Sequence, residues 1–125
     1  AADYFVALAP LTDQTHQLFD AAAFHAMRNH AVVINVGRGP LVDTDALVDA
    51  LRAGQIAGAG LDVTNPEPLP DGHPLWEMPN VVITPHLANP PYSVRHRIGA
   101  HAAKVMEHFA AGEAIPTEVD TEAGY

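Results

Sequence analysis

The sequence has 125 residues, of which 48% are hydrophobic and 17% are charged, and its formal net charge is −9. These values are typical of one globular domain or of a large part of a two-domain protein. The negative charge argues against nucleic acid and anionic membranes as partners, and the lack of cysteine excludes disulfides and thiolate metal sites. No apolar run approaches the roughly 20 residues of a membrane span, and the first residues do not resemble a secretory signal, so we expect a soluble, cytoplasmic protein.

The first part of the chain predicts a strand, a helix and a second strand. Residues 4–9, "YFVALA", form a short apolar run typical of a buried strand. A helix is expected soon afterwards, with Asp20 as its N-cap. Residues 31–35, "AVVIN", are rich in β-branched side chains and too few for a helix, so they predict the second strand.

A second helix follows the glycines of "NVGRGP". Asp43 or Thr44 is its expected N-cap, and the helix should continue to about Ala53. Its apolar residues recur on one face, as expected of a helix that packs on a sheet. Gly54 is the predicted stop signal.

The rest of the chain predicts two further strands and one long helix. The strands are expected at residues 56–63, "IAGAGLDV", and 81–84, "VVIT". Between them lies a proline-rich segment that cannot form a regular element. The last helix should run from about Ser93 to Ala111, with apolar residues three and four apart. Strands that alternate with helices predict an α/β fold with a parallel sheet and helices on its faces.

Polar side chains follow three of these strands, where a parallel α/β sheet binds its ligands. They are Arg38, Asp62 and His86. Arg38 lies between two glycines, which allow a ligand to approach the backbone closely. Its planar guanidinium can bind a carboxylate through two parallel hydrogen bonds. The alternative is an arginine that caps backbone carbonyls or pairs with a surface acid.

His86 and Glu67 are candidates for moving a proton. A histidine at a strand end with a carboxylate nearby is a common proton donor and acceptor near neutral pH. Glu67 lies between two prolines, and beside His86 it would stabilise the imidazolium, an acid able to protonate a developing alkoxide. The alternatives are a structural histidine and a solvated loop glutamate. Asp62 either caps a turn or accepts a hydrogen bond from an amide-bearing ligand.

Other chemistries have little support in the sequence. Ser93 is the only serine, and no G-x-S-x-G motif surrounds it, which argues against a serine hydrolase. The histidine spacings do not match a metal site, so no metal is expected.

Four stretches together resemble one known family closely: "VALAPLT", "VINVGRGPLVDTDALVDALRAGQIAGAGLDV", "PEPLPDGHPLWEMPNVVITPH" and "HFAAGEAI". The family is that of the D-isomer-specific 2-hydroxyacid dehydrogenases, and the resemblance covers residues 4 to about 115. It implies a Rossmann-like, doubly wound parallel sheet, of which residues 1–91 would be the C-terminal half of the dinucleotide-binding domain. Residues 92–125 would supply the final helix and a tail that returns toward a substrate domain.

The resemblance also implies an activity and roles for individual residues. The protein would be a cytoplasmic, homodimeric oxidoreductase that uses NAD or NADP to interconvert a small 2-keto acid and a D-2-hydroxy acid. Arg38 would hold the substrate carboxylate, His86 would be the general acid/base and Glu67 its partner. Asp62 would contact the nicotinamide carboxamide. The implied cofactor-binding residues are Pro10, Val36, Gly37, Asp62 and Ala88.

Some features of the family pattern are missing from the sequence. The G-x-G-x-x-G turn, and the residue that selects NAD or NADP, are expected upstream of Ala1, so the chain should be a C-terminal portion of a longer enzyme and inactive by itself. Pro90 and Pro91 replace small residues common after the histidine, which affects cofactor contacts there. Glu67 argues against formate dehydrogenases, which generally have glutamine at this position. A dinucleotide-sensing interaction protein of the co-repressor type is the alternative function.

Overall fold

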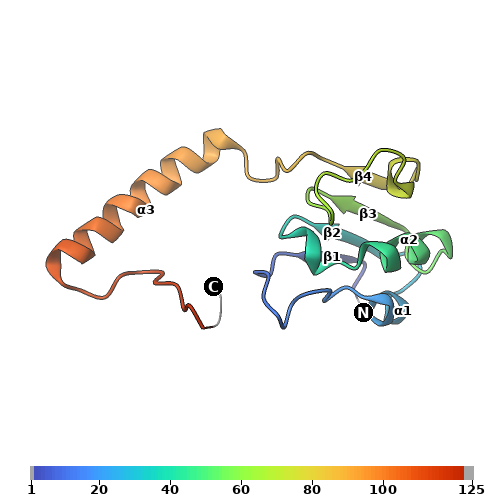
Figure 1. The fold of residues 1–125 in the computed structure, drawn as a ribbon, viewed down its shortest axis with the longest axis horizontal. Helices are drawn as coiled ribbons and strands as arrows, with labels where there is room; N and C mark the ends of the chain where they lie inside the picture. The colour runs from blue at the N-terminus through green and yellow to red at the C-terminus, as the bar shows by residue number, and fades with distance from the viewer. Residues whose placement is uncertain (1, 123–125) are drawn as a thin grey trace. The chain divides into compact units, whose positions relative to one another are not determined.

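The computed structural model describes residues 2–122, and the chain divides into two units, one ending at His86 and one beginning at Leu87. In the first unit, four parallel strands form one sheet in the order β1-β2-β3-β4 (Figure 1). Sequential strands are thus neighbours, as expected when each pair is joined by a crossover. The strands are β1 (Tyr4–Ala7), β2 (Val32–Asn35), β3 (Gly58–Leu61) and β4 (Val81–Ile83).

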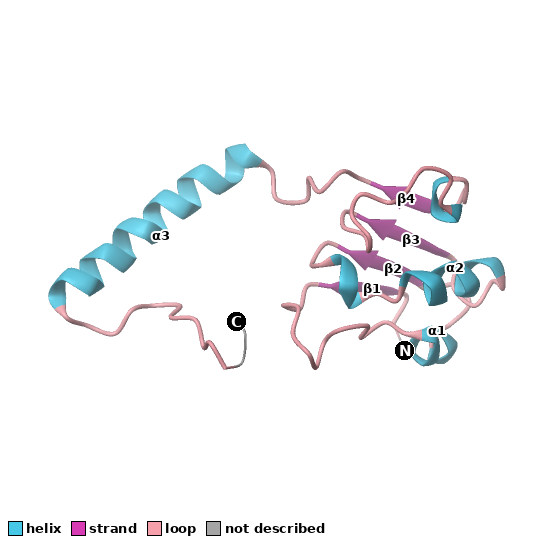
Figure 2. Ribbon diagram, in the orientation of Figure 1, coloured by secondary structure: helices cyan, strands magenta, loops and turns pink. Residues whose placement is uncertain are grey.

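Two helices of the first unit, α1 (Ala21–Ala26) and α2 (Thr44–Arg52), lie on the same face of this sheet (Figures 1 and 2). Asp20 caps α1, and its side chain accepts a hydrogen bond from the Ala23 N–H at 2.8 Å. Asp43, not Thr44, caps α2 by accepting from the Ala46 N–H at 3.0 Å. Such a cap stabilises a helix by about 1 kcal/mol.

The hydrophobic core lies between these helices and the sheet. Phe24 of α1 and Leu47 of α2 are almost completely buried and belong to one cluster with Val33 of the sheet. Short 3₁₀ turns at Gly39–Leu41 and Pro74–Trp76 add Leu41 and Leu75 to the buried set.

The other face of the sheet carries a row of registered residues, Val6, Ile34, Gly60 and Val82. Residues paired across parallel strands point to the same side. Val6 and Val82 are exposed, and the helices described in this unit cover only the opposite face. The α/β sheet predicted from the sequence is confirmed, and within the described part of the first unit its helices are on one face.

The strands are shorter than the apolar runs that predict them. β3 covers Gly58–Leu61, yet Ile56 and Val63 on either side are also buried. An apolar run in the sequence indicates which residues are buried, whereas the bounds of a strand are set by backbone hydrogen bonds to its neighbours. In this sheet the buried residues extend beyond the hydrogen-bonded ones. β1 likewise ends at Ala7, two residues before the predicted end.

The second unit contains a short segment from Leu87, then α3 (Pro91–Ala111), and then the residues that follow it. The helix begins two residues before the predicted Ser93, because proline is well suited to the first turn of a helix. It ends at Gly112, whose φ of 69° is left-handed. Among the described helices, none has the length and hydropathy that a membrane span requires.

Candidate active site

The carboxyl ends of the strands bring Asp62 and His86 together. Backbone pairing continues past the strands, because the Asp62 N–H donates to the Asn35 carbonyl at 2.9 Å and the His86 N–H donates to the Asp62 carbonyl at 3.0 Å. His86 has a φ of 56°, a left-handed conformation that is uncommon outside glycine. The chain therefore turns sharply at His86, directly beside the end of β3.

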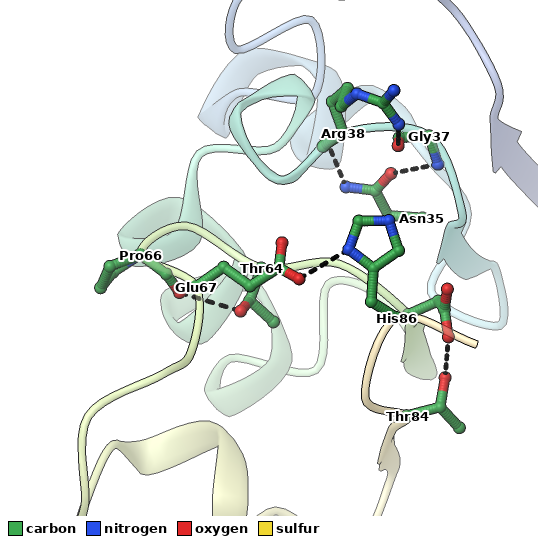
Figure 3. Close-up of polar contacts among 9 residues, drawn as sticks. Asn35, Gly37, Arg38, Thr64, Pro66, Glu67, Thr84 and His86 are labelled. Carbon is green, nitrogen blue, oxygen red and sulfur yellow. Dashed lines mark hydrogen bonds and ion pairs between the residues drawn. The ribbon is translucent and has the colours of Figure 1, made fainter. Parts of the chain in front are cut away.

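His86 and Glu67 are in contact, as the sequence predicted for a proton-transfer pair. Nδ1 of His86 lies 2.8 Å from Oε1 of Glu67 (Figure 3). The side chains are 54% and 42% exposed, so solvent reaches both. The contact fixes the orientation of the imidazole and directs its second nitrogen, Nε2, away from the carboxylate.

Arg38 lies in a loop that is held by the side chain of Asn35 (Figure 3). Asn35 ends β2 and is completely buried. Its Nδ2 donates to the Arg38 carbonyl at 2.9 Å, and its Oδ1 accepts from the Gly37 N–H at 3.1 Å. The Arg38 guanidinium itself is exposed, and Nη1 donates to the Gly37 carbonyl at 2.8 Å.

Asn35 was not among the residues singled out from the sequence. The available signal was its position, because Asn35 shares a strand face with the buried Val33. A polar side chain at a core position needs hydrogen-bond partners, and those partners are the backbone of the next loop.

The segment that carries Glu67 packs against the loop that carries Arg38. Gly39 meets the backbone of Thr64, and the Thr44 hydroxyl donates to the Asn65 carbonyl at 2.6 Å. The Thr64 hydroxyl donates to the Pro66 carbonyl at 2.9 Å. These contacts place the predicted substrate arginine and the predicted partner of His86 on two adjoining, anchored segments.

Asp62, Glu67 and His86 line one cavity of about 660 Å³. Its other walls include apolar side chains, among them Leu69 and Trp76. Asp62 is only 6% exposed, and its Oδ1 accepts a hydrogen bond from the Thr84 hydroxyl at 2.5 Å. Arg38 is not among the residues that line this cavity.

Four of the predicted cofactor residues belong to the first unit, where Val36 and Gly37 lie beside the segment that leads to Pro10. Val36 follows β2 and donates its N–H to the Ala7 carbonyl at 3.4 Å. A Cβ on Gly37 would lie 3.4 Å from the Ala9 carbonyl, so Gly37 is beside the segment that leads to Pro10. Asp62 is one strand further along the sheet, and Ala88 belongs to the second unit. The roles of all these residues stay predictions. No cluster of metal-binding side chains occurs among residues 2–122.

A parallel sheet with polar side chains at its carboxyl edge is typical of part of a Rossmann-like α/β domain. The family model for the NAD binding domain of D-isomer specific 2-hydroxyacid dehydrogenases matches residues 1–88. The chain belongs to that family.

Individual relatives support the same membership. The chain is 58% identical over 124 residues to an uncharacterized protein from the proB 3′ region of Corynebacterium melassecola, and the match covers 99% of this chain and 41% of that protein. It is 48% identical over 102 residues to glyoxylate/hydroxypyruvate reductase B of Citrobacter koseri, with coverage of 82% and 32%. The chain thus spans less than half the length of these two relatives.

A solved structure extends the likeness to the whole fold. A D-isomer specific 2-hydroxyacid dehydrogenase from Xanthobacter autotrophicus, solved with NADPH and MES, superposes with a TM-score of 0.88 at 41% identity. The match covers 99% of this chain and 50% of that one.

The residues at the strand ends fit the nicotinamide end of a dinucleotide. Asp62 offers buried carboxylate oxygens, which accept hydrogen bonds from an amide NH₂ group. At Gly37 a Cβ would lie 2.9 Å from Leu41 Cδ1 and 3.1 Å from the Ala7 carbonyl oxygen, so Gly37 packs closely against the end of β1 and leaves no room for a side chain. A carboxylate acceptor at the strand edge suits a ligand that carries a carboxamide, such as a nicotinamide ring.

Proposed function

We propose that the chain is part of an oxidoreductase that uses NAD or NADP to interconvert a small 2-keto acid and the D-2-hydroxy acid. The observation that carries the proposal is the 2.8 Å contact between His86 and Glu67, at the same strand edge as the buried Asp62. The Citrobacter relative is named a glyoxylate/hydroxypyruvate reductase, so glyoxylate and hydroxypyruvate are the substrates to try first.

His86 is the proposed general acid/base. Glu67 occupies Nδ1, which leaves Nε2 to face the substrate oxygen. In the direction of reduction the protonated ring donates its proton to that oxygen, and in oxidation the neutral ring removes the hydroxyl proton. Glu67 holds the ring in one orientation and stabilises its positive charge in the protonated state. The dinucleotide supplies the hydride when it is bound.

Arg38 is the proposed anchor for the substrate carboxylate. A guanidinium has five N–H donors, and the contact to the Gly37 carbonyl uses one nitrogen, Nη1. A bound carboxylate would replace this contact with two charge-assisted hydrogen bonds. Because Asn35 fixes the Arg38 backbone, only the side chain has to turn toward the substrate.

The test uses the intact natural polypeptide that carries residues 1–125, with glyoxylate or hydroxypyruvate and with NADH or NADPH. Oxidation of the reduced dinucleotide, followed by its absorbance, supports the proposal. Tight dinucleotide binding without turnover of any small 2-keto acid would contradict it and favour the sensor of the co-repressor type.

The proposal includes a homodimer in the cytoplasm, for which family membership is the support. Sedimentation of the intact polypeptide would give its oligomeric state, and a monomeric mass would remove that part of the proposal.

A further inference from the structure

Thr84 makes a hydrogen bond to the side chain of Asp62. The Thr84 hydroxyl donates to Asp62 Oδ1 at 2.5 Å, and the Thr84 N–H donates to the Leu61 carbonyl at 2.9 Å. The backbone pairing therefore sets residue 84 beside the end of β3, and the side chain adds a bond to the carboxylate. Thr84 was not among the residues singled out from the sequence.

The same junction includes His86. The His86 N–H donates to the carbonyl oxygens of both Asp62 and Thr84, at 3.0 Å each. Thr84 is thus bonded to Asp62 by its side chain, and His86 is bonded to both residues by its backbone. Thr84 and His86 both lie in the segment that follows β4, and both form hydrogen bonds to Asp62. This segment therefore joins the proposed acid/base, His86, to the proposed acceptor for the nicotinamide carboxamide, Asp62.

The chemistry of this contact favours a fixed direction for the carboxylate. Asp62 is 6% exposed, and a buried carboxylate depends on hydrogen-bond donors for its stability. Threonine is branched at Cβ, so its hydroxyl has few orientations. An ionised carboxylate has about four acceptor positions, so a carboxamide N–H can bind Asp62 while the threonine hydroxyl remains bonded.

We propose that Thr84 is a positioning residue that directs the Asp62 carboxylate toward the carboxamide of the bound nicotinamide. Because Thr84 and Asp62 both bond the backbone of His86, this contact also sets the nicotinamide position relative to the acid/base. The inference rests on the proposed function for the role of Asp62. Beyond the proposed function, it names Thr84 as the residue that orients Asp62, and the nicotinamide end as the part of the dinucleotide whose binding depends on Thr84.

The test compares Thr84→Val with Thr84→Ser in the intact natural polypeptide. Valine keeps the shape and removes the hydroxyl, whereas serine keeps the hydroxyl. The measurement is the Kd for the dinucleotide and, separately, for ADP-ribose or its 2′-phosphate, which lack the nicotinamide ring.

Thr84 is exposed, so the substitution leaves the core unchanged. Thr84→Ala is a second hydroxyl-free variant, and Thr117→Val removes a hydroxyl from the second unit as a matched control.

We expect T84V and T84A to weaken dinucleotide binding by about 3- to 10-fold, less than the loss of a whole hydrogen bond to a charged group, because the carboxamide contact to Asp62 is misdirected and not removed. The Kd for the ring-free nucleotide should stay within about 2-fold of wild type, as should both constants in T84S and T117V. Equal weakening for both ligands in T84V and T84A would overturn the inference, as would unchanged binding of both.

The proposed function is tested by a separate measurement, the turnover of a 2-keto acid by the wild-type polypeptide. If wild type binds dinucleotide without turnover, the catalytic proposal fails and the two Kd values still decide the role of Thr84. If wild type binds no dinucleotide, both proposals are wrong.

Discussion

A Cβ atom built on Gly39 would lie 1.9 Å from the carbonyl oxygen of Thr64 and 2.5 Å from its carbonyl carbon. Real Cβ atoms do not approach backbone so closely, so only glycine allows the two chain segments to touch. One segment carries Arg38 and the other leads to Glu67. The glycine after Arg38 therefore serves the packing of two protein segments, whereas the sequence suggested that it provides space for a ligand.

Replacing Gly39 with alanine should separate these two segments. We expect Gly39→Ala to lower the free energy of unfolding by about 1–3 kcal/mol, the range found for overpacked positions. Chemical denaturation of the intact polypeptide would measure it. The control is Gly99→Ala in α3, where a Cβ meets nothing within 4 Å. That change should be neutral or stabilise the helix by up to about 1 kcal/mol, and equal effects of the two substitutions would argue against the packing role.

Asn35→Asp tests the side chain that holds the Arg38 loop. The aspartate keeps the acceptor for the Gly37 N–H and loses the donor to the Arg38 carbonyl, which leaves two acceptors facing each other in a buried place. We expect a loss of about 2–4 kcal/mol in the free energy of unfolding, because a buried charge and an unsatisfied carbonyl are both unfavourable. Asn80→Asp, at an exposed position, should have a much smaller effect. Similar losses at both positions would mean that the loop does not depend on Asn35.

The strands and helix ends could be predicted from the sequence, because they leave local signals in it. The apolar runs located each strand, and Asp20 and the glycine after α2 marked helix ends, because these signals are local in sequence. The role of Asn35 depends on which face of β2 it occupies and on the path of the next loop. The contact between Thr84 and Asp62 depends on strand register. Register comes from pairing across the sheet, which no local pattern specifies.

The pairing of His86 with Glu67 could be proposed from the sequence. His86 follows a predicted strand directly after a proline, and Glu67 is a carboxylate between two prolines. Their distance in space could not be derived in that way, because the segment between β3 and β4 has no regular structure. Arg38 was grouped with them, yet it does not line the cavity that the other two share.

His86→Ala should reduce kcat for 2-keto acid reduction by about 10²- to 10⁴-fold, the usual contribution of a general acid. Dinucleotide affinity should change little, because the proposed contact for the nicotinamide is Asp62. The free energy of unfolding should fall by less than about 1 kcal/mol, since the pair with Glu67 is half exposed. His16→Ala, at an exposed position in the loop before α1, is the control and should retain full activity. Retention of kcat by the His86 variant would remove the assignment.

Glu67→Gln keeps a side chain that can hydrogen-bond to His86 and removes the negative charge. We expect kcat to fall by about 10- to 100-fold, less than in the histidine variant, because the ring stays oriented but its protonated form loses a charge partner. Steady-state kinetics at saturating dinucleotide would measure the change, with the exposed Glu77→Gln as control. A variant as active as wild type would show that His86 works without the carboxylate.

Arg38→Lys keeps the positive charge and removes the planar fork. An ammonium group cannot form two parallel hydrogen bonds to one carboxylate, so KM for the 2-keto acid should rise by about 10-fold or more. The Kd for the dinucleotide should not change, because the guanidinium is proposed to contact only the substrate. Arg52→Lys on the exposed side of α2 controls for the general effect of the exchange. If the Arg38 variant instead lost dinucleotide affinity while KM for the acid stayed constant, the arginine would belong to the cofactor site, and another group would have to bind the substrate carboxylate.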